Sequence, residues 1–127
     1  MKTLILIGIG GFLGAIFRYL VSGYVYQWTR AADFPFGTLV VNLLGCLLIG
    51  FLTFLAESHG LFTSESRAFL IVGLLGSLTT YSTFGQETMN LMRDGEPTAA
   101  LLNVSVHLIF GLGAVWVGRV IGFLLWR

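Results

Sequence analysis

The sequence predicts an all-α membrane protein with four transmembrane helices in a single membrane domain, residues 1–127. Of its 127 residues, 56% are hydrophobic and only 10% are charged, and the mean hydropathy is +0.89. Such a chain has too little polar surface for a water-soluble globule. Three charge-free runs, at residues 36–56, 68–86 and 97–118, each approach the roughly 20 residues that a spanning helix needs. We therefore expect helices at about residues 3–29, 36–58, 67–92 and 97–125.

The first of these helices, residues 3–29, carries Arg18 as its one charged side chain. The segment is long enough to cross the hydrocarbon layer if Arg18 extends to the interface or faces protein. A cleaved signal peptide is the alternative, with Lys2 as its basic start and residues 3–17 as its apolar core. Because residues 19–28 stay apolar and aromatic instead of starting a polar mature chain, a transmembrane helix is the better interpretation.

The connections between the helices are short and contain most of the charged residues, so no soluble domain fits in them. Pro35 and Pro97 stand at the entrances of the second and fourth helices, where the missing amide hydrogen of proline costs no intrahelical bond. Small residues four apart, Gly10 with Gly14 and Gly118 with Gly122, predict close helix packing without specifying the partner helix.

The distribution of basic residues says little about orientation in the membrane. Lys2, Arg67 and Arg127 fall on one side and Arg30 and Arg93 on the other, whereas a clear topology signal requires a cytoplasmic excess. So weak a bias permits insertion in both orientations and assembly of two opposite copies as an antiparallel dimer. A single orientation set weakly by the first helix remains the alternative.

Polar side chains inside the second and fourth helices are candidate functional groups, because they are costly in hydrocarbon unless protein or water satisfies them. Asn42 lies on one face of the second helix with Thr38 and Cys46. Asn103 and His107 are four residues apart and share a face of the fourth helix. For each of these groups, a hydrogen bond that joins two helices is the structural alternative.

The third helix contains five hydroxyl residues between Ser77 and Thr83, preceded by Gly73 and Gly76. Glycine relaxes the backbone and hydroxyl groups compete for its hydrogen bonds, which favours a break near the middle of the helix. At membrane depth, the freed carbonyl and amide groups of such a break serve as ion ligands. A continuous helix whose hydroxyls bond carbonyls four residues earlier is the alternative.

Four stretches together resemble the small fluoride channels of the CrcB/Fluc family, and they cover essentially the whole chain in order. They are Gly10-Gly11-x-x-Gly14-Ala15-x-x-Arg18-Tyr19, Gly37-Thr38-Leu39-Val40-Val41-Asn42-x-x-Gly45, Gly76-x-x-Thr79-Thr80-Tyr81-Ser82-Thr83-Phe84, and Gly111-Leu112-Gly113-Ala114-Val115-Trp116-Val117-Gly118. The second and third stretches are the specific ones.

The resemblance implies a fluoride-selective channel in the cytoplasmic (inner) membrane that exports fluoride passively and confers fluoride resistance. It implies an antiparallel homodimer with two pores and a central structural sodium ion, held by the backbone carbonyls of Gly76 and Thr79. The matching pore residues are Asn42, Tyr81, Ser82, Thr83 and Phe84, with Arg18 and Glu87 at the vestibules.

The chain departs from the family pattern at three positions of the proposed pore. Tyr81 stands where phenylalanine is more frequent, Asn103 where tyrosine is frequent, and His107 where serine is frequent. Asn103 and His107 are kept as pore candidates. Because histidine titrates at a pKa of about 6.5, protonation of His107 would place a positive charge beside an anion path.

Two other functions remain open on sequence grounds. A small dual-topology exporter that couples protons to cationic drugs needs an acidic residue midway along the first helix, where this chain has only Arg18 as a charged group. A non-conducting scaffold would account for the glycines but not for the hydroxyl cluster. The sequence contains no nucleophile and base pair typical of an enzyme and no motif or basic patch for nucleic acid.

Overall fold

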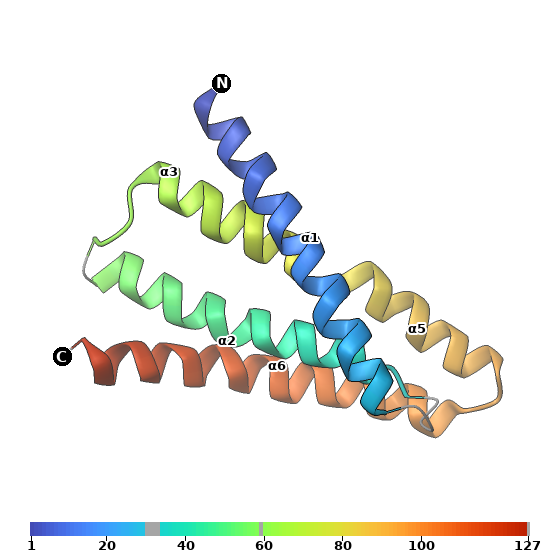
Figure 1. Ribbon diagram of the computed structural model, residues 1–127. Helices are drawn as coiled ribbons and strands as arrows, with labels where there is room; N and C mark the ends of the chain where they lie inside the picture. Colours follow the sequence, from blue (N-terminus) through green and yellow to red (C-terminus); the bar gives the residue numbers. More distant parts are fainter. Residues whose placement is uncertain (30–33, 59, 127) are drawn as a thin grey trace.

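The computed structural model describes residues 1–29, 34–58 and 60–126, and within these ranges it contains helices and no strands. The four long helical segments are each long and apolar enough to cross a membrane, which confirms the all-α membrane fold. The elements are α1 (Lys2–Trp28), α2 (Phe36–Ser58), α3 (Ser64–Arg67), the π-helix η1 (Ala68–Leu75), α4 (Gly76–Leu78), α5 (Tyr81–Arg93) and α6 (Pro97–Leu125) (Figure 1).

The third span, from Ser64 to Arg93, is assembled from four of these elements. It begins at α3, where the Thr63 hydroxyl accepts the amide hydrogen of Ser66, continues through η1 and α4, and is interrupted at Thr79 and Thr80 before α5 begins. The interruption lies within the hydroxyl cluster, as the sequence predicts. The wide turns of η1 have no counterpart in the sequence pattern.

The turn between the third and fourth spans is closed by backbone hydrogen bonds. The amide of Gly95 donates to Met92 O at 3.3 Å and that of Glu96 donates to Leu91 O at 2.9 Å, which is the paired arrangement that ends a helix with a left-handed residue. Gly95 has a φ of 81°, a conformation that glycine adopts without steric cost. Pro97 then opens α6.

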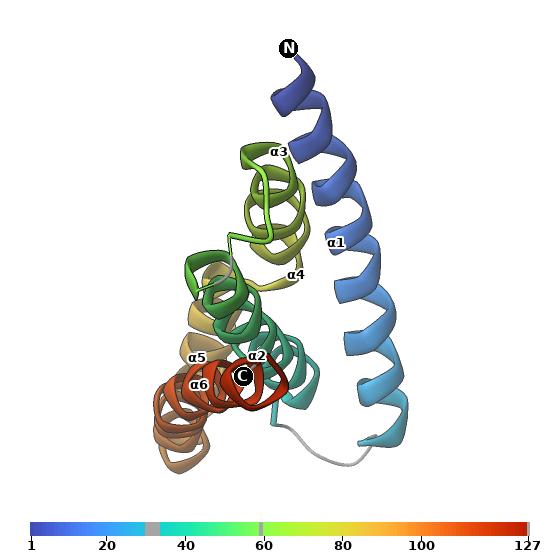
Figure 2. The ribbon, with the colours of Figure 1, turned by 90° about the vertical axis from the view of Figure 1, so that its left-hand side faces the viewer.

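Helices α2 and α6 lie side by side along their length, whereas α1 crosses the molecule and packs against η1 and α4 (Figures 1 and 2). Glycines occupy both contact regions. A Cβ atom on Gly50 would overlap Val115 O, and one on Gly118 would overlap Leu47 O. The predicted close packing at Gly118 is therefore a contact between α2 and α6 of the same chain.

The second predicted glycine pair lies where α1 meets the third span. A Cβ on Gly10 would overlap Phe69 O, and one on Gly14 would overlap Leu74 O. Both carbonyls belong to η1, so the two backbones touch with no side chain between them. These contacts bring α1 against the segment that leads into the interruption.

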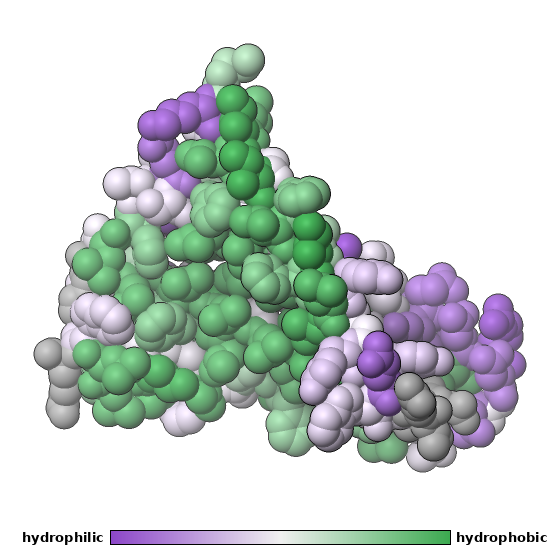
Figure 3. Space-filling model, in the orientation of Figure 1, coloured by the Kyte–Doolittle hydropathy of each residue, from purple (hydrophilic) through white to green (hydrophobic). Residues whose placement is uncertain are grey.

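The surface has a broad apolar region with polar groups at its ends (Figure 3). At one end, Lys2 pairs with Glu65 and Arg119 with Glu57, each at 2.9 Å. Arg119 therefore lies with Lys2 at this end. Arg30 and Arg127 were counted among the basic residues on the two sides of the membrane, and both lie outside the described residues.

The packing of α2 on α6 leads to a stability prediction. Gly118→Val places a side chain against the Leu47 carbonyl, so we expect the two helices to separate and the free energy of unfolding to fall by about 1–3 kcal/mol. Gly113→Val is the matched control on the same helix, because a Cβ there meets nothing within 4 Å. Thermal unfolding in detergent measures both variants, and equal melting temperatures would contradict the packing assignment.

Candidate functional site

The candidate site is built around the interruption of the third span. Thr79 and Thr80 both have extended backbone conformations, with ψ of 156° and 117°. Thr80 is also the N-cap of α5, because its hydroxyl oxygen accepts the amide hydrogen of Thr83 at 3.2 Å. Threonine is a favoured residue at this capping position. Thr80 therefore ends the extended segment and starts the second half of the span.

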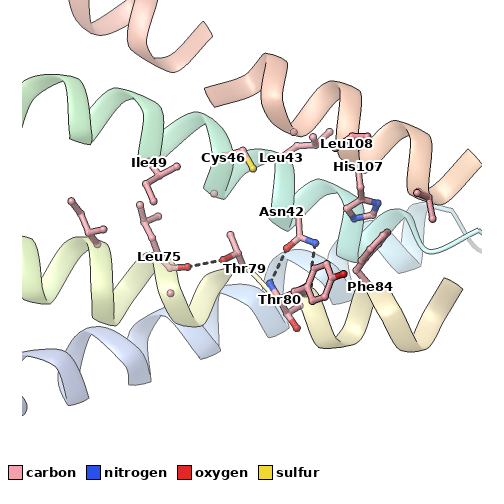
Figure 4. A pocket seen from close by; sticks show the side chains of 16 residues that line it. Asn42, Leu43, Cys46, Ile49, Leu75, Thr79, Thr80, Phe84, His107 and Leu108 are labelled. Carbon is pink, nitrogen blue, oxygen red and sulfur yellow. Dashed lines mark hydrogen bonds between the residues drawn. The ribbon is translucent and has the colours of Figure 1, made fainter. Parts of the chain in front are cut away.

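Asn42 of α2 holds the interruption through both polar atoms of its side chain (Figure 4). Its Oδ1 accepts the Thr80 amide hydrogen at 2.9 Å, and its Nδ2 donates to the Thr80 carbonyl at 3.2 Å. Asn42 thus makes hydrogen bonds that join two spans, which was the structural alternative for this residue. An amide nitrogen carries two hydrogens, so this bond leaves one N–H of Asn42 for a second acceptor.

The family resemblance assigns a sodium ion to the backbone carbonyls of Gly76 and Thr79. The interruption removes the amide groups that would bond these two carbonyls in a continuous helix. In a continuous helix, Gly76 O would accept from the Thr80 amide and Thr79 O from the Thr83 amide. Here these amides donate to Asn42 Oδ1 and to Thr80 Oγ1. Main-chain oxygens are ligands that suit a hard cation, so the residues present fit a sodium ion.

The first cavity has a volume of about 570 Å³ and lies beside this interruption, between α2, the third span and α6 (Figure 4). Gly45 brings α2 close to it, because a Cβ on Gly45 would overlap the methyl group of Thr79. Its lining includes Asn42, Gly76, Thr79, Thr80, Tyr81, Phe84 and His107. None of the described residues that line this cavity is an acid, a lysine or an arginine.

Three aromatic rings form one wall of the first cavity. The rings of Tyr81 and Phe84 have centroids 5.6 Å apart, and those of Phe84 and His107 are 4.5 Å apart. Tyr81 is 84% exposed in the single chain. An aromatic edge is electropositive, so this wall offers weak contacts to an anion.

Hydrogen bonds connect this wall to the interior of the helix pair α5 and α6. Asn103 is 0% exposed and donates from Nδ2 to the Thr88 hydroxyl at 2.9 Å. The Thr88 hydroxyl donates to Phe84 O at 2.8 Å. His107 Nδ1 lies 2.9 Å from the carbonyl oxygen of Asn103. These bonds fix the orientation of α6 relative to the cavity wall.

The second cavity, of about 280 Å³, lies on another side of Thr80. It is lined by Ala15, Arg18, Tyr19, Ser22, Thr38, Val41, Thr80 and Thr83. Thr38 donates to Glu87 Oε1 at 2.6 Å, and Glu87 Oε2 is buried without a hydrogen-bond partner among the described residues. The guanidinium of Arg18 gives this cavity a positive group. Thr80 lines both cavities.

The predicted site residues are therefore distributed unevenly. The first cavity brings together Asn42, Gly76, Thr79, Tyr81, Phe84 and His107. Arg18 and Thr83 line the second cavity, which Glu87 adjoins through its bond to Thr38. Ser82 and Asn103 line neither cavity. Ser82 is exposed, with its hydroxyl 3.3 Å from that of Thr80.

Three residues of the site were not among the predicted site residues, namely Thr38, Thr80 and Thr88, although the sequence places Thr38 on the same helix face as Asn42. Thr80 is the most central, since it caps α5, bonds Asn42 and lines both cavities. The sequence feature that could have identified Thr80 is its place in the hydroxyl cluster between Ser77 and Thr83. No spacing along one helix reveals the bonds from Thr38 to Glu87 and from Asn103 to Thr88, because each joins two helices.

Comparison with known proteins gives a consistent result over nearly the whole chain. A family model described as "CrcB-like protein, Camphor Resistance (CrcB)" matches residues 5–119. A protein of Hydrogenovibrio crunogenus named "Fluoride-specific ion channel FluC" is 49% identical over 91% of this chain and 86% of its own length. "Fluoride-specific ion channel FluC 1" of Methanosarcina acetivorans is 42% identical over 94% and 90% of the two chains.

A third relative, from Shewanella sp. (strain ANA-3) and also named "Fluoride-specific ion channel FluC", is 44% identical over 97% of this chain and 98% of its own. The match to the family model spans all four helical segments and includes the interrupted third span with Asn42 opposite it. This multi-pass membrane protein belongs to the CrcB family.

Proposed function

We propose that this chain is the subunit of a channel that conducts fluoride passively across the cytoplasmic membrane and thereby confers fluoride resistance. The observation that carries the proposal is the position of Thr80, which lines both cavities at the interruption of the third span. A polar interruption of a membrane span that lies between two cavities is the arrangement expected of an ion pathway. The names of the relatives identify fluoride as the ion to test.

The side chains along this pathway suit a small anion. Arg18 in the second cavity attracts an anion electrostatically. The hydroxyls of Thr80 and Thr83 lie 3.0 Å apart, and the second N–H of Asn42 supplies a donor to the first cavity. The ring edges of Tyr81 and Phe84 replace part of the hydration shell. Closely set donors favour fluoride over larger halides, since selectivity follows site size and donor strength.

The proposal includes a homodimer in which the two copies are antiparallel. Tyr81 is 84% exposed although it stands at the interruption of a membrane span, and the first cavity is open on one side of a single chain. A second copy that covers this side would enclose two pathways, one per subunit. The opposite arrangement of the copies agrees with the weak bias of basic residues.

A structural sodium ion at the dimer centre is part of the same proposal. The Gly76 and Thr79 carbonyls of each subunit would hold it, since their usual amide partners bond Asn42 and Thr80 instead. The ion would supply a fixed positive charge between the interrupted third spans of the two subunits. The chain itself keeps these carbonyls free of helical hydrogen bonds.

Fluoride efflux from liposomes tests the function directly. Purified protein is reconstituted into vesicles loaded with potassium fluoride or potassium chloride, a potassium ionophore is added, and ion-selective electrodes follow release. We expect rapid fluoride release and no chloride release above that of protein-free vesicles. Absence of fluoride release from folded, dimeric protein would contradict the proposal.

The role of Asn42 gives a more specific prediction. Asn42→Ala removes both bonds to Thr80 and leaves a part-buried amide and carbonyl without these partners, a loss of up to about 1–3 kcal/mol per group. We therefore expect fluoride efflux to fall roughly tenfold or more. Asn90→Ala is the control, since Asn90 lies on α5 and lines neither cavity. Equal efflux in the Asn42 and Asn90 variants would rule out this role.

Cysteine labelling tests the antiparallel arrangement. In a Cys46→Ser background, Glu96→Cys places one exposed thiol in the connection between α5 and α6, and Leu61→Cys places one in the connection between α2 and α3. These two connections lie at opposite ends of the molecule (Figure 1). We expect a membrane-impermeant maleimide to label about half of each variant in intact cells, because both orientations are present. Complete labelling of one variant with none of the other would show a single orientation and overturn this part of the proposal.

A further inference from the structure

Asn103 occupies a position where a polar side chain is costly. The residue is 0% exposed, and its Oδ1 is buried and makes no hydrogen bond to any described residue. A leucine of similar size would avoid this cost, because a buried polar atom without a partner is unfavourable. What asparagine offers here and leucine does not is the hydrogen bond from its Nδ2.

This hydrogen bond joins α6 to α5. Asn103 Nδ2 donates to the Thr88 hydroxyl at 2.9 Å, and the Thr88 hydroxyl in turn donates to the Phe84 carbonyl oxygen at 2.8 Å. Consecutive hydrogen bonds of this kind strengthen one another. The amide of α6 is therefore linked, through one hydroxyl, to the backbone of the residue whose ring forms part of the cavity wall.

The same two helices meet again one turn nearer the interruption. There the rings of Phe84 and His107 lie 4.5 Å apart (Figure 4), and His107 Nδ1 lies 2.9 Å from the Asn103 carbonyl oxygen, an atom to which it can only donate. Thr88 faces Asn103 as Phe84 faces His107, so these are successive contacts of one antiparallel helix pair. The polar contact lies behind the wall, and the ring contact lines the first cavity.

Apolar packing alone defines the rotation of a membrane helix poorly. Lipid tails are as apolar as the side chains, so hydrophobic contacts give little preference for one helix orientation over another. A single buried asparagine, in contrast, can specify how two helices align. Helix α5 has 13 residues and starts at the interruption. A rotation of α5 about its axis would therefore displace the rings of both Tyr81 and Phe84.

We infer that Thr88 and Asn103 are positioning residues of the fluoride pathway, whose hydrogen bond fixes the rotation of α5 on α6 and thereby places Phe84 and His107 at the wall of the first cavity. The inference rests on the proposed function, and it adds two residues that do not themselves line the cavity. Replacing both bonded partners by apolar groups of the same shape changes stability little. The pair should therefore matter more for conduction than for stability.

The first test is a double variant in which Thr88→Val and Asn103→Leu replace the bonded pair by an apolar one. We expect its melting temperature in detergent to stay within about 3 °C of the wild type, while fluoride efflux from liposomes falls about tenfold because the rings are misplaced. Thr88→Ser keeps the hydroxyl and should keep most of the efflux. Ser105→Ala is the matched control, since it removes an exposed hydroxyl of α6 that bonds the Leu101 carbonyl four residues earlier.

The second test follows the position of the rings without requiring conduction. In a His59→Gln background, His107 is the remaining histidine, and NMR of histidine-labelled protein gives the chemical shifts of its ring protons. The neighbouring Phe84 ring alters these shifts, and Phe84→Leu supplies the values without it. We expect the double variant to move towards the Phe84→Leu values and Ser105→Ala to keep those of the wild type.

Three results would overturn the inference. They are wild-type efflux in the double variant, a loss of efflux that is matched by a loss of thermal stability, and unchanged His107 shifts in a folded double variant. Absence of efflux from the wild type would instead overturn the proposed channel, and the NMR comparison would still decide whether the Thr88–Asn103 bond places the rings.

Discussion

The structure depends on the pair of hydrogen bonds between Asn42 and Thr80. A helix that breaks within the membrane exposes backbone groups where no water is present to bond them, at a cost of several kcal/mol per group. The Asn42 side chain satisfies the amide and the carbonyl of the same residue. This arrangement permits an extended segment at Thr79 and Thr80, and both cavities lie next to it.

The close approach of helix backbones holds Asn42 at the correct place. α2 lies against α6 because Gly50 and Gly118 have no side chains to separate them, and it lies against the interruption because Gly45 accommodates the Thr79 methyl group. Each of these contacts involves an atom that a Cβ would overlap. The small residues therefore act on the site indirectly, through the position of the helix that carries Asn42.

The two sides of the interruption differ in chemistry. The second cavity has a cationic group, Arg18, and hydroxyls, which suit capture of an anion from water. The first cavity has aromatic rings, one amide and the imidazole of His107, which suit an anion that has lost part of its hydration shell. The backbone carbonyl of Asn103 lies 2.9 Å from His107 Nδ1, so a hydrogen bond within α6 orients the imidazole at the cavity wall.

The sequence by itself determined the four spans and the place where the third one breaks. Both are local properties, set by the length of charge-free runs and by a cluster of glycine and hydroxyl residues. The tertiary structure alone decided that Asn42 bonds Thr80, that Asn103 is buried against Thr88, and that Thr38 bonds Glu87. These bonds join different helices, and the periodicity of one helix shows which residues share a face but not which atoms lie opposite.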